Sequence, residues 1–186
     1  MRTLITILFL LLFRFSICGQ QDMKTGIIYG KDFAYSLTAP NGWILDNKSG
    51  VNQGLDAVFY RTGESWDRAE TVMYTNTASL EDKAHKSLDK LIKYDLDDFR
   101  RNYSDIIIVD GKDILIGKNE IAKIKYLSGK SYKNFEAIAY IDAGKTGVMI
   151  VISSRTKKGF NNSLIAFEEL VKSYFFMTNK VILKDK

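Results

Sequence analysis

Short runs rich in β-branched and aromatic residues, separated by polar, turn-prone residues, occupy the early part of the chain, a pattern typical of β-strands. Residues 26–38 contain two such runs separated by a turn-prone segment at 30–32, and this spacing predicts a hairpin. Pro40 and the Asn41–Gly42 pair follow. Proline cannot donate to a sheet and Asn–Gly favours positive φ, so these residues are expected to end the second strand.

Further strand-like runs recur to the end of the chain. They occupy residues 56–61, 70–76, 106–111, 120–129, 134–144 and 146–154, and a polar segment at 46–54 between the early runs is expected to be a loop. The run at 146–154 is apolar almost without alternation. This predicts a central strand that is covered on both faces.

Two segments change to the periodicity of helices. Residues 79–103 carry apolar residues at spacings of three and four, and Ser79 followed by Asp82 resembles a capping box at the start. Residues 159–177 carry a broad apolar stripe, which predicts a second, well-buried helix.

The order of these elements predicts the fold class. Short hairpin links favour a largely antiparallel central sheet, and two helices with a doubly buried strand favour helices on both faces. We therefore expect an α+β protein, an α/β/α sandwich, formed by one domain over residues 20–186.

Residues 1–19 have the pattern of an export signal. Arg2 precedes a run at 3–13 that is apolar except for two threonines, and this run is short for a bilayer span. Cleavage after Gly19 would release a periplasmic or secreted protein. The alternative is lipid attachment at Cys18, where "FSIC" loosely matches a bacterial lipobox. Either route leaves no cysteine pair for a disulfide.

The order of elements, together with "FAYSLTAPNGW" at 33–43 and "AVFY" at 57–60, resembles the PsbP-like fold family. That family includes the photosystem II extrinsic protein PsbP, the Ran-binding Mog-type proteins and uncharacterised bacterial exported proteins. The resemblance covers about residues 27–178. It implies a non-catalytic accessory or binding role, and no functional residue is carried over from the family.

Charge does not favour a nucleic-acid partner. Loss of residues 1–19 would reduce the 27 basic residues to 25, against 22 acidic ones, and the two signs are interspersed. A membrane partner is expected only if Cys18 is lipidated.

A phosphate-loop-like motif, "AYIDAGKT" at 139–146, leads into a strand rather than a helix. A phosphate loop must open a helix, so this segment predicts a hairpin turn and no nucleotide site. The single histidine, His85, is expected on the polar face of the first helix. With no cysteine partner it predicts no metal site, and no cofactor is expected.

The candidate binding residues gather around the loop at 46–54. Trp43, Asp46, Asn47, Tyr60 and Trp66 combine aromatic and polar groups, which is the composition of a recognition surface or sugar-stacking groove. A structural alternative is that the two tryptophans seal the rim of the core.

Two functions remain open on the sequence alone. The first is an exported, non-enzymatic accessory or binding protein whose partner is a protein or small molecule of the cell envelope. The alternative is an exported hydrolase in which carboxylates such as Asp46, Asp56, Glu64 and Asp67 converge in the fold. No catalytic residue can be assigned from a motif.

Overall fold

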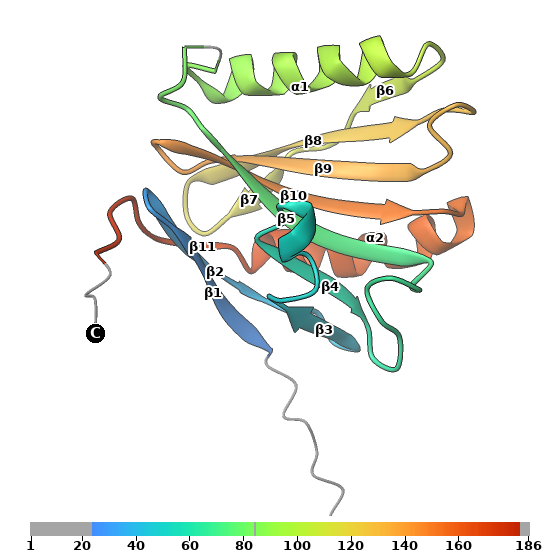
Figure 1. The fold of residues 1–186 in the computed structure, drawn as a ribbon, viewed down its shortest axis with the longest axis horizontal. Helices are drawn as coiled ribbons and strands as arrows, with labels where there is room; N and C mark the ends of the chain where they lie inside the picture. The colour runs from blue at the N-terminus through green and yellow to red at the C-terminus, as the bar shows by residue number, and fades with distance from the viewer. Residues whose placement is uncertain (1–23, 84, 183–186) are drawn as a thin grey trace, which may run out of the picture.

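The computed structural model describes residues 24–83 and 85–182, which form two antiparallel sheets and two long helices (Figure 1). The predicted signal at 1–19 and Cys18 lie outside these residues. The strands are β1 (Thr25–Gly30), β2 (Phe33–Thr38), β3 (Trp43–Asp46), β4 (Ala57–Arg61), β5 (Thr71–Ser79), β6 (Ile107–Asp110), β7 (Ile114–Ile116), β8 (Glu120–Ser128), β9 (Phe135–Asp142), β10 (Thr146–Ser154) and β11 (Phe175–Thr178). The helices are α1 (Leu88–Asn102), α2 (Lys157–Lys172) and the short 3₁₀ helix η1 (Val51–Gln53).

The smaller sheet has the order β1-β2-β11. β1 and β2 pair antiparallel from Thr25–Thr38 to Gly30–Phe33, which confirms the predicted hairpin. One face of this sheet is buried, because Tyr35 and Leu37 of β2 are both fully enclosed in the core.

The "PNGW" segment connects the two sheets. The Trp43 amide donates to the Pro40 carbonyl over 3.0 Å, and Gly42 has φ 78°, a left-handed conformation that glycine adopts without strain. This turn ends β2, as predicted, and leads the chain from the small sheet into β3 of the large one.

The larger sheet has the order β3-β4-β5-β10-β9-β8-β6, with β7 also pairing with β8. Every pairing in it is antiparallel. β10 lies between β5 and β9 and is buried on both faces, as its apolar sequence predicted.

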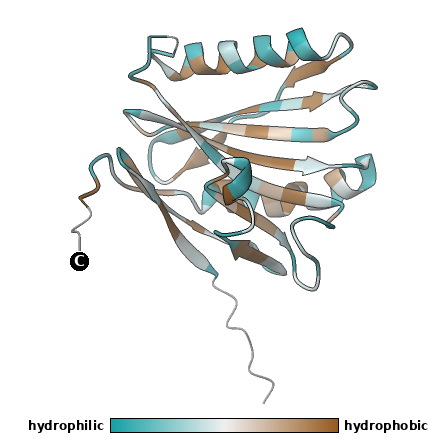
Figure 2. Cartoon of the chain, viewed as in Figure 1, coloured by the Kyte–Doolittle hydropathy of each residue, from teal (hydrophilic) through white to brown (hydrophobic). Residues whose placement is uncertain are grey.

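Helices cover both faces of the large sheet, which confirms the predicted sandwich (Figure 1). On one face α2 packs with the small sheet over Ala137, Ala139, Ile141, Ile150 and Ile152. On the other face α1 packs over Ile138, Tyr140 and Val151. The polar side of α1 points away from the sheet (Figure 2). Each helix therefore buries its apolar stripe on the sheet.

The predicted start of the first helix at Ser79 is wrong. β5 continues to Ser79, which pairs with Thr146, and the Leu80 amide donates to the Lys145 carbonyl over 2.8 Å. The helix begins at Leu88 after the cap residue Ser87. His85 consequently precedes the helix and packs edge-on against Tyr94, with 4.6 Å between ring centroids, instead of lying on a polar helix face.

The predicted end of the second helix at residue 177 is also wrong. α2 ends at Lys172, because the Ser173 hydroxyl bonds the Leu170 carbonyl at 2.7 Å and accepts the Thr38 amide at 2.9 Å. The following residues form β11, which pairs with β2. The apolar residues at the end of the predicted helix therefore belong to the small sheet.

The phosphate-loop-like motif is a hairpin turn between β9 and β10, as predicted. The Ala143 amide donates to the Thr146 carbonyl over 2.9 Å, and Gly144 has φ 81°. The Gly144 amide donates to the Asp142 carboxylate over 2.8 Å, so this carboxylate caps the turn.

Candidate functional site

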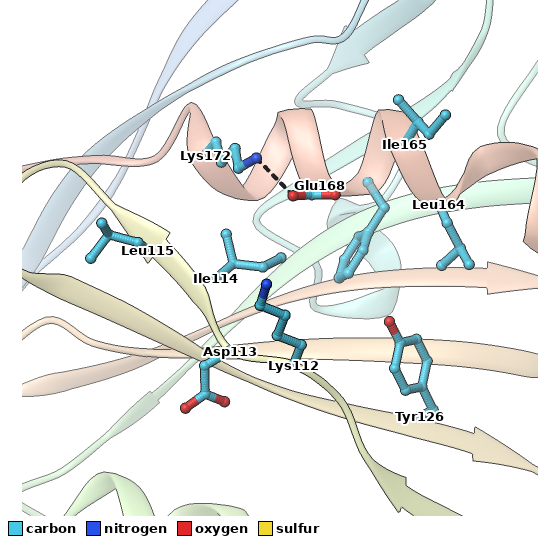
Figure 3. A pocket seen from close by; sticks show the side chains of 10 residues that line it. Lys112, Asp113, Ile114, Leu115, Tyr126, Leu164, Ile165, Glu168 and Lys172 are labelled. Carbon is cyan, nitrogen blue, oxygen red and sulfur yellow. Dashed lines mark hydrogen bonds and ion pairs between the residues drawn. The ribbon is translucent and has the colours of Figure 1, made fainter.

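A groove of about 500 Å³ lies between β7 and α2 (Figure 3). The strand side is formed by Lys112, Asp113, Ile114 and Leu115, and the helix side by residues from Leu164 to Lys172. β7 contains only Ile114–Ile116, a run too short to be predicted from periodicity. The short apolar run "ILI" at 114–116, bounded by Asp113 and Gly117, is the signal that could have indicated it.

The floor of the groove is apolar. Ile114, Tyr126 and Leu164 line it together with the buried Phe167, and Figure 3 shows the first three around the space between strand and helix. The Tyr126 ring is held edge-on against Phe160, with 6.2 Å between centroids. Ile165 at the margin is 75% exposed. Such a surface can bind apolar side chains of a partner.

Charged groups of both signs stand at the rim. On α2 the Lys172 ammonium lies 2.7 Å from the Glu168 carboxylate (Figure 3). On the strand side Lys112 and Asp113 are exposed neighbours. These solvated charges add little to stability, but they can select the polar ends of a bound segment.

The apolar surface continues from the groove to an edge of the sheet. Val109 of β6 pairs directly with Tyr126 of β8, and cross-strand partners share a face of the sheet. Ile107 lies two residues earlier on the same face, and both β6 residues are more than half exposed. Within the described residues, β6 is the edge strand at this end of the large sheet. We call Ile107, Val109, Ile114, Tyr126 and Leu164 the groove strip.

The predicted site residue Trp43 belongs to the core. Its side chain is only 4% exposed in the α2-side cluster, and the Arg61 guanidinium lies over its ring at 5.1 Å. This agrees with the structural alternative, in which the indole seals the core rather than facing a ligand.

The structure brings Asp46 and Tyr60 into contact, but the contact is used inside the protein, where it orders the loop that follows β3. The Asp46 carboxylate accepts hydrogen bonds from the Lys48 amide at 2.7 Å, the Ser49 amide and hydroxyl at 3.0 and 2.6 Å, and the Tyr60 hydroxyl at 3.1 Å. Partial burial raises the pKa of Asp46, yet these hydrogen bonds outweigh it and leave the pKa below its usual value. This carboxylate therefore orders the loop.

Asn47 and Trp66 lie apart from each other. Asn47 is exposed and lines a cavity of about 170 Å³ together with Asp56, Ile27 and Tyr29. Trp66 is half-buried and packs edge-on against Tyr74, with 6.2 Å between centroids. Tyr74 packs with the α1-side cluster, whereas Trp43 lies in the α2-side cluster. The two tryptophans therefore do not share one surface, and ligand binding at this set stays a prediction.

The four carboxylates of the hydrolase alternative have separate environments. The Asp67 carboxylate accepts the Ser65 hydroxyl at 2.7 Å, and Asp46 is engaged by its loop as described. Glu64 lines a polar cleft beside the start of α2. Asp56 faces the small cavity next to Asn47, where burial raises its pKa. None of the other three carboxylates contributes to the pKa shifts of Asp46, Asp56 or Asp67.

A buried acidic cluster was missed from the sequence. Glu136 of β9 is only 4% exposed, and burial raises its pKa despite hydrogen bonds from Ser153 and Tyr132. Asp95 of α1 accepts a hydrogen bond from the Tyr140 hydroxyl, and burial likewise raises its pKa. The cluster lies between α1 and the sheet, among the buried residues that pack beneath the helix.

Two further properties concern only the described ranges 24–83 and 85–182. They contain no group of three or more histidine, cysteine, aspartate or glutamate side chains placed to hold a metal ion. Nor does any helix within them combine the length and apolar character needed to cross a bilayer.

Comparison with known proteins relates the chain to solved structures. No family model and no curated protein matches the sequence. The solution structure of cyanobacterial PsbP (CyanoP) from Synechocystis sp. PCC 6803 superposes with a TM-score of 0.53 at 10% identity, covering 86% of this chain and 96% of that one. The Saccharomyces cerevisiae Ran-binding protein Mog1p gives 0.50 at 14% identity, covering 82% and 94%. At such identities the similarity concerns the fold.

Proposed function

We propose that this chain, which has the PsbP/Mog1-like fold, is a non-enzymatic accessory protein that binds a protein partner through the groove strip. The observation that carries the proposal is the continuity between the apolar groove and the terminal strand β6. A groove with hydrophobic lining next to an open strand edge suits an extended segment of another protein.

The geometry suits binding by strand addition. The partner backbone would hydrogen-bond along β6 (Ile107–Asp110), and its alternate side chains would extend the face formed by Ile107 and Val109. A large apolar side chain of the partner would enter the hollow above Ile114 and Tyr126. The mixed charges at the rim would pair with polar residues that flank this anchor.

The class of partner and its location are part of the proposal. Mog1p is named for binding Ran, which is a protein partner, and this supports a protein ligand rather than a small molecule. We place the interaction in the cell envelope, because residues 1–19 have the pattern of an export signal. The separate hydrogen-bond partners and cavities of the four carboxylates favour binding over hydrolysis.

Site-specific photo-crosslinking in producing cells tests the groove. A photoreactive residue at Ile165, on the groove margin, is expected to give one discrete crosslinked partner band. The same residue at Tyr94, exposed on α1 over the other face of the sheet, is the matched control and should give none. Substitution Val109→Asp should abolish the band at Ile165. Equal labelling from both positions would overturn the proposal.

Export is tested independently of the partner. The mass of the native protein should correspond to a chain beginning at Gln20, or at lipidated Cys18 for the alternative route. Fractionation should recover it with periplasmic or envelope markers. A cytoplasmic chain that retains Met1 to Gly19 would refute the export route.

A further inference from the structure

The small sheet has an exposed apolar face on the side opposite the core. Ile27 of β1 and Phe175 of β11 both pair with Ser36 of β2, so all three lie on the same face. Tyr29 lies on this face as well, two residues after Ile27. The exposed fractions are 56% for Ile27, 58% for Tyr29 and 66% for Phe175. We call these three residues the outer patch.

The side chains of the outer patch project far enough from the sheet to contact a flat surface. The central strand β2 contributes only small side chains here, Ala34 and Ser36, because Tyr29 pairs with Ala34 and Ile27 with Ser36. The larger side chains therefore project from the two flanking strands. A clustered apolar surface of this kind marks an interaction site more often than scattered exposed residues do.

Basic residues stand at both ends of the outer patch. Lys24 precedes β1, and Lys31 lies in the turn after it, beside one acid, Asp32. The Val181 amide donates to the Lys31 carbonyl over 3.4 Å, so the exposed Lys180 lies close to this turn. Asp56 lines a small cavity together with Ile27 and Tyr29. Three lysines, Lys24, Lys31 and Lys180, thus face two acids, Asp32 and Asp56, around the patch.

We propose that the outer patch docks the domain on the surface of an anionic phospholipid bilayer. Aliphatic and aromatic side chains surrounded by lysines are the composition of interfacial membrane contacts, where the chains enter the headgroup region and the ammonium groups meet lipid phosphates. A symmetric contact with a second copy would instead bring the same lysines together, and like charges oppose it.

The position of β1 in the chain supports this occupant. If Cys18 carries the lipid, only five residues separate it from Lys24. They span at most about 20 Å even when fully extended. A lipid-attached chain would thus hold β1, and the outer patch with it, next to the bilayer. The proposal goes beyond the proposed function, since the outer patch shares no residue with the groove strip.

Flotation of the full chain with lipid vesicles tests the docking. Wild type should float with vesicles that contain phosphatidylglycerol. The double variant Ile27→Ser/Phe175→Ser should reduce the partition coefficient at least about tenfold, because two anchoring side chains are lost. The matched control Val51→Ser/Tyr94→Ser removes two exposed apolar side chains elsewhere and should bind as wild type. All variants share the same N-terminal sequence, so the difference reports the patch.

Two further measurements separate the charge and folding contributions. The double variant Lys24→Gln/Lys31→Gln should bind phosphatidylglycerol vesicles more weakly than wild type, and added salt should have the same effect. Both changes should affect binding to neutral phosphatidylcholine vesicles much less. In unmodified protein, amide exchange in β1 and β11 should slow when vesicles are added, while exchange in α1 should not. This readout is independent of whether a variant folds.

Three results would overturn the proposal. These are equal vesicle binding by the patch and control variants, unchanged exchange in β1 and β11, or a lipid-independent dimer that Phe175→Ser dissociates in sedimentation velocity. The last would assign the outer patch to a second copy. None of them alters the crosslinking result expected at Ile165, so failure here is distinguishable from failure of the groove proposal.

Discussion

Glu136 shows how one residue can couple the interior to pH. It lies on the α1-side face of β9, enclosed with Tyr132 and near Asp95, and no lysine or arginine contributes to its pKa shift. A carboxyl group without a cation is more stable in its neutral form when buried. The strand around Glu136 could be predicted from sequence, but its burial could not, because it depends on where α1 packs.

We predict that Glu136→Gln stabilises the protein at neutral pH. The folded-state pKa of Glu136 lies above its ordinary value of 4.5, so its favourable contribution is complete below that value and is lost as pH rises through the folded-state pKa. The glutamine amide cannot ionise. The free energy of unfolding of Glu136→Gln should therefore exceed that of wild type by about 1 kcal/mol or more near pH 7, and the two values should converge near pH 4. Urea unfolding across this range measures it. Glu169→Gln, an exposed change on α2, is the control. Parallel curves for wild type and Glu136→Gln would contradict the prediction.

At the scale of elements, the sequence predicted which strands and helices exist better than where they end. The hairpin β1–β2, the central strand β10 and both long helices follow from local periodicity. The errors at Ser79 and Ser173 share one cause. Ser79 pairs with Thr146 and Ser173 bonds Thr38, so each boundary is determined by a contact far away in sequence. The groove was missed for the same reason, since it exists only where β7 meets α2.

We predict that Ser173→Ala destabilises the end of α2 and its attachment to β2. The substitution removes the hydroxyl that bonds the Leu170 carbonyl and the Thr38 amide, and it leaves a partly buried amide without that partner. The loss should be about 1–2 kcal/mol in the free energy of unfolding. Chemical denaturation of Ser173→Ala and of Ser104→Ala, an exposed serine, compares the two. If both variants unfold alike, the hydroxyl has no such role.

At the scale of the whole molecule, the two sheets meet where β1 passes over β3. Gly26 allows this approach, since a Cβ atom placed there would lie 2.8 Å from Leu45 Cδ1. Leu45 is itself buried in the α2-side core. The contact holds the small sheet, with its exposed outer patch, in a fixed position relative to the sheet that carries the groove strip.

We predict that Gly26→Val separates the small sheet from the large one. The branched side chain would collide with Leu45, and such overpacking costs about 1–3 kcal/mol. Amide exchange should accelerate in β1 and β2 more than in β9 and β10. Tyr29→Val, which puts a branched side chain at an exposed position of β1, is the control. Uniform acceleration across all strands would mean that the two sheets unfold as one unit.

The pairing of β11 with β2 has a consequence for biosynthesis. Residues 33–38 cannot complete their sheet until residues 175–178 have left the ribosome. In the same way, β5 cannot pair with β10 until residues 146–154 have been synthesised. Loops this long make such contacts slow to form. The nascent chain therefore stays incompletely folded through most of its synthesis. For the export route we propose, that delay keeps the polypeptide in the extended state that a secretion channel accepts.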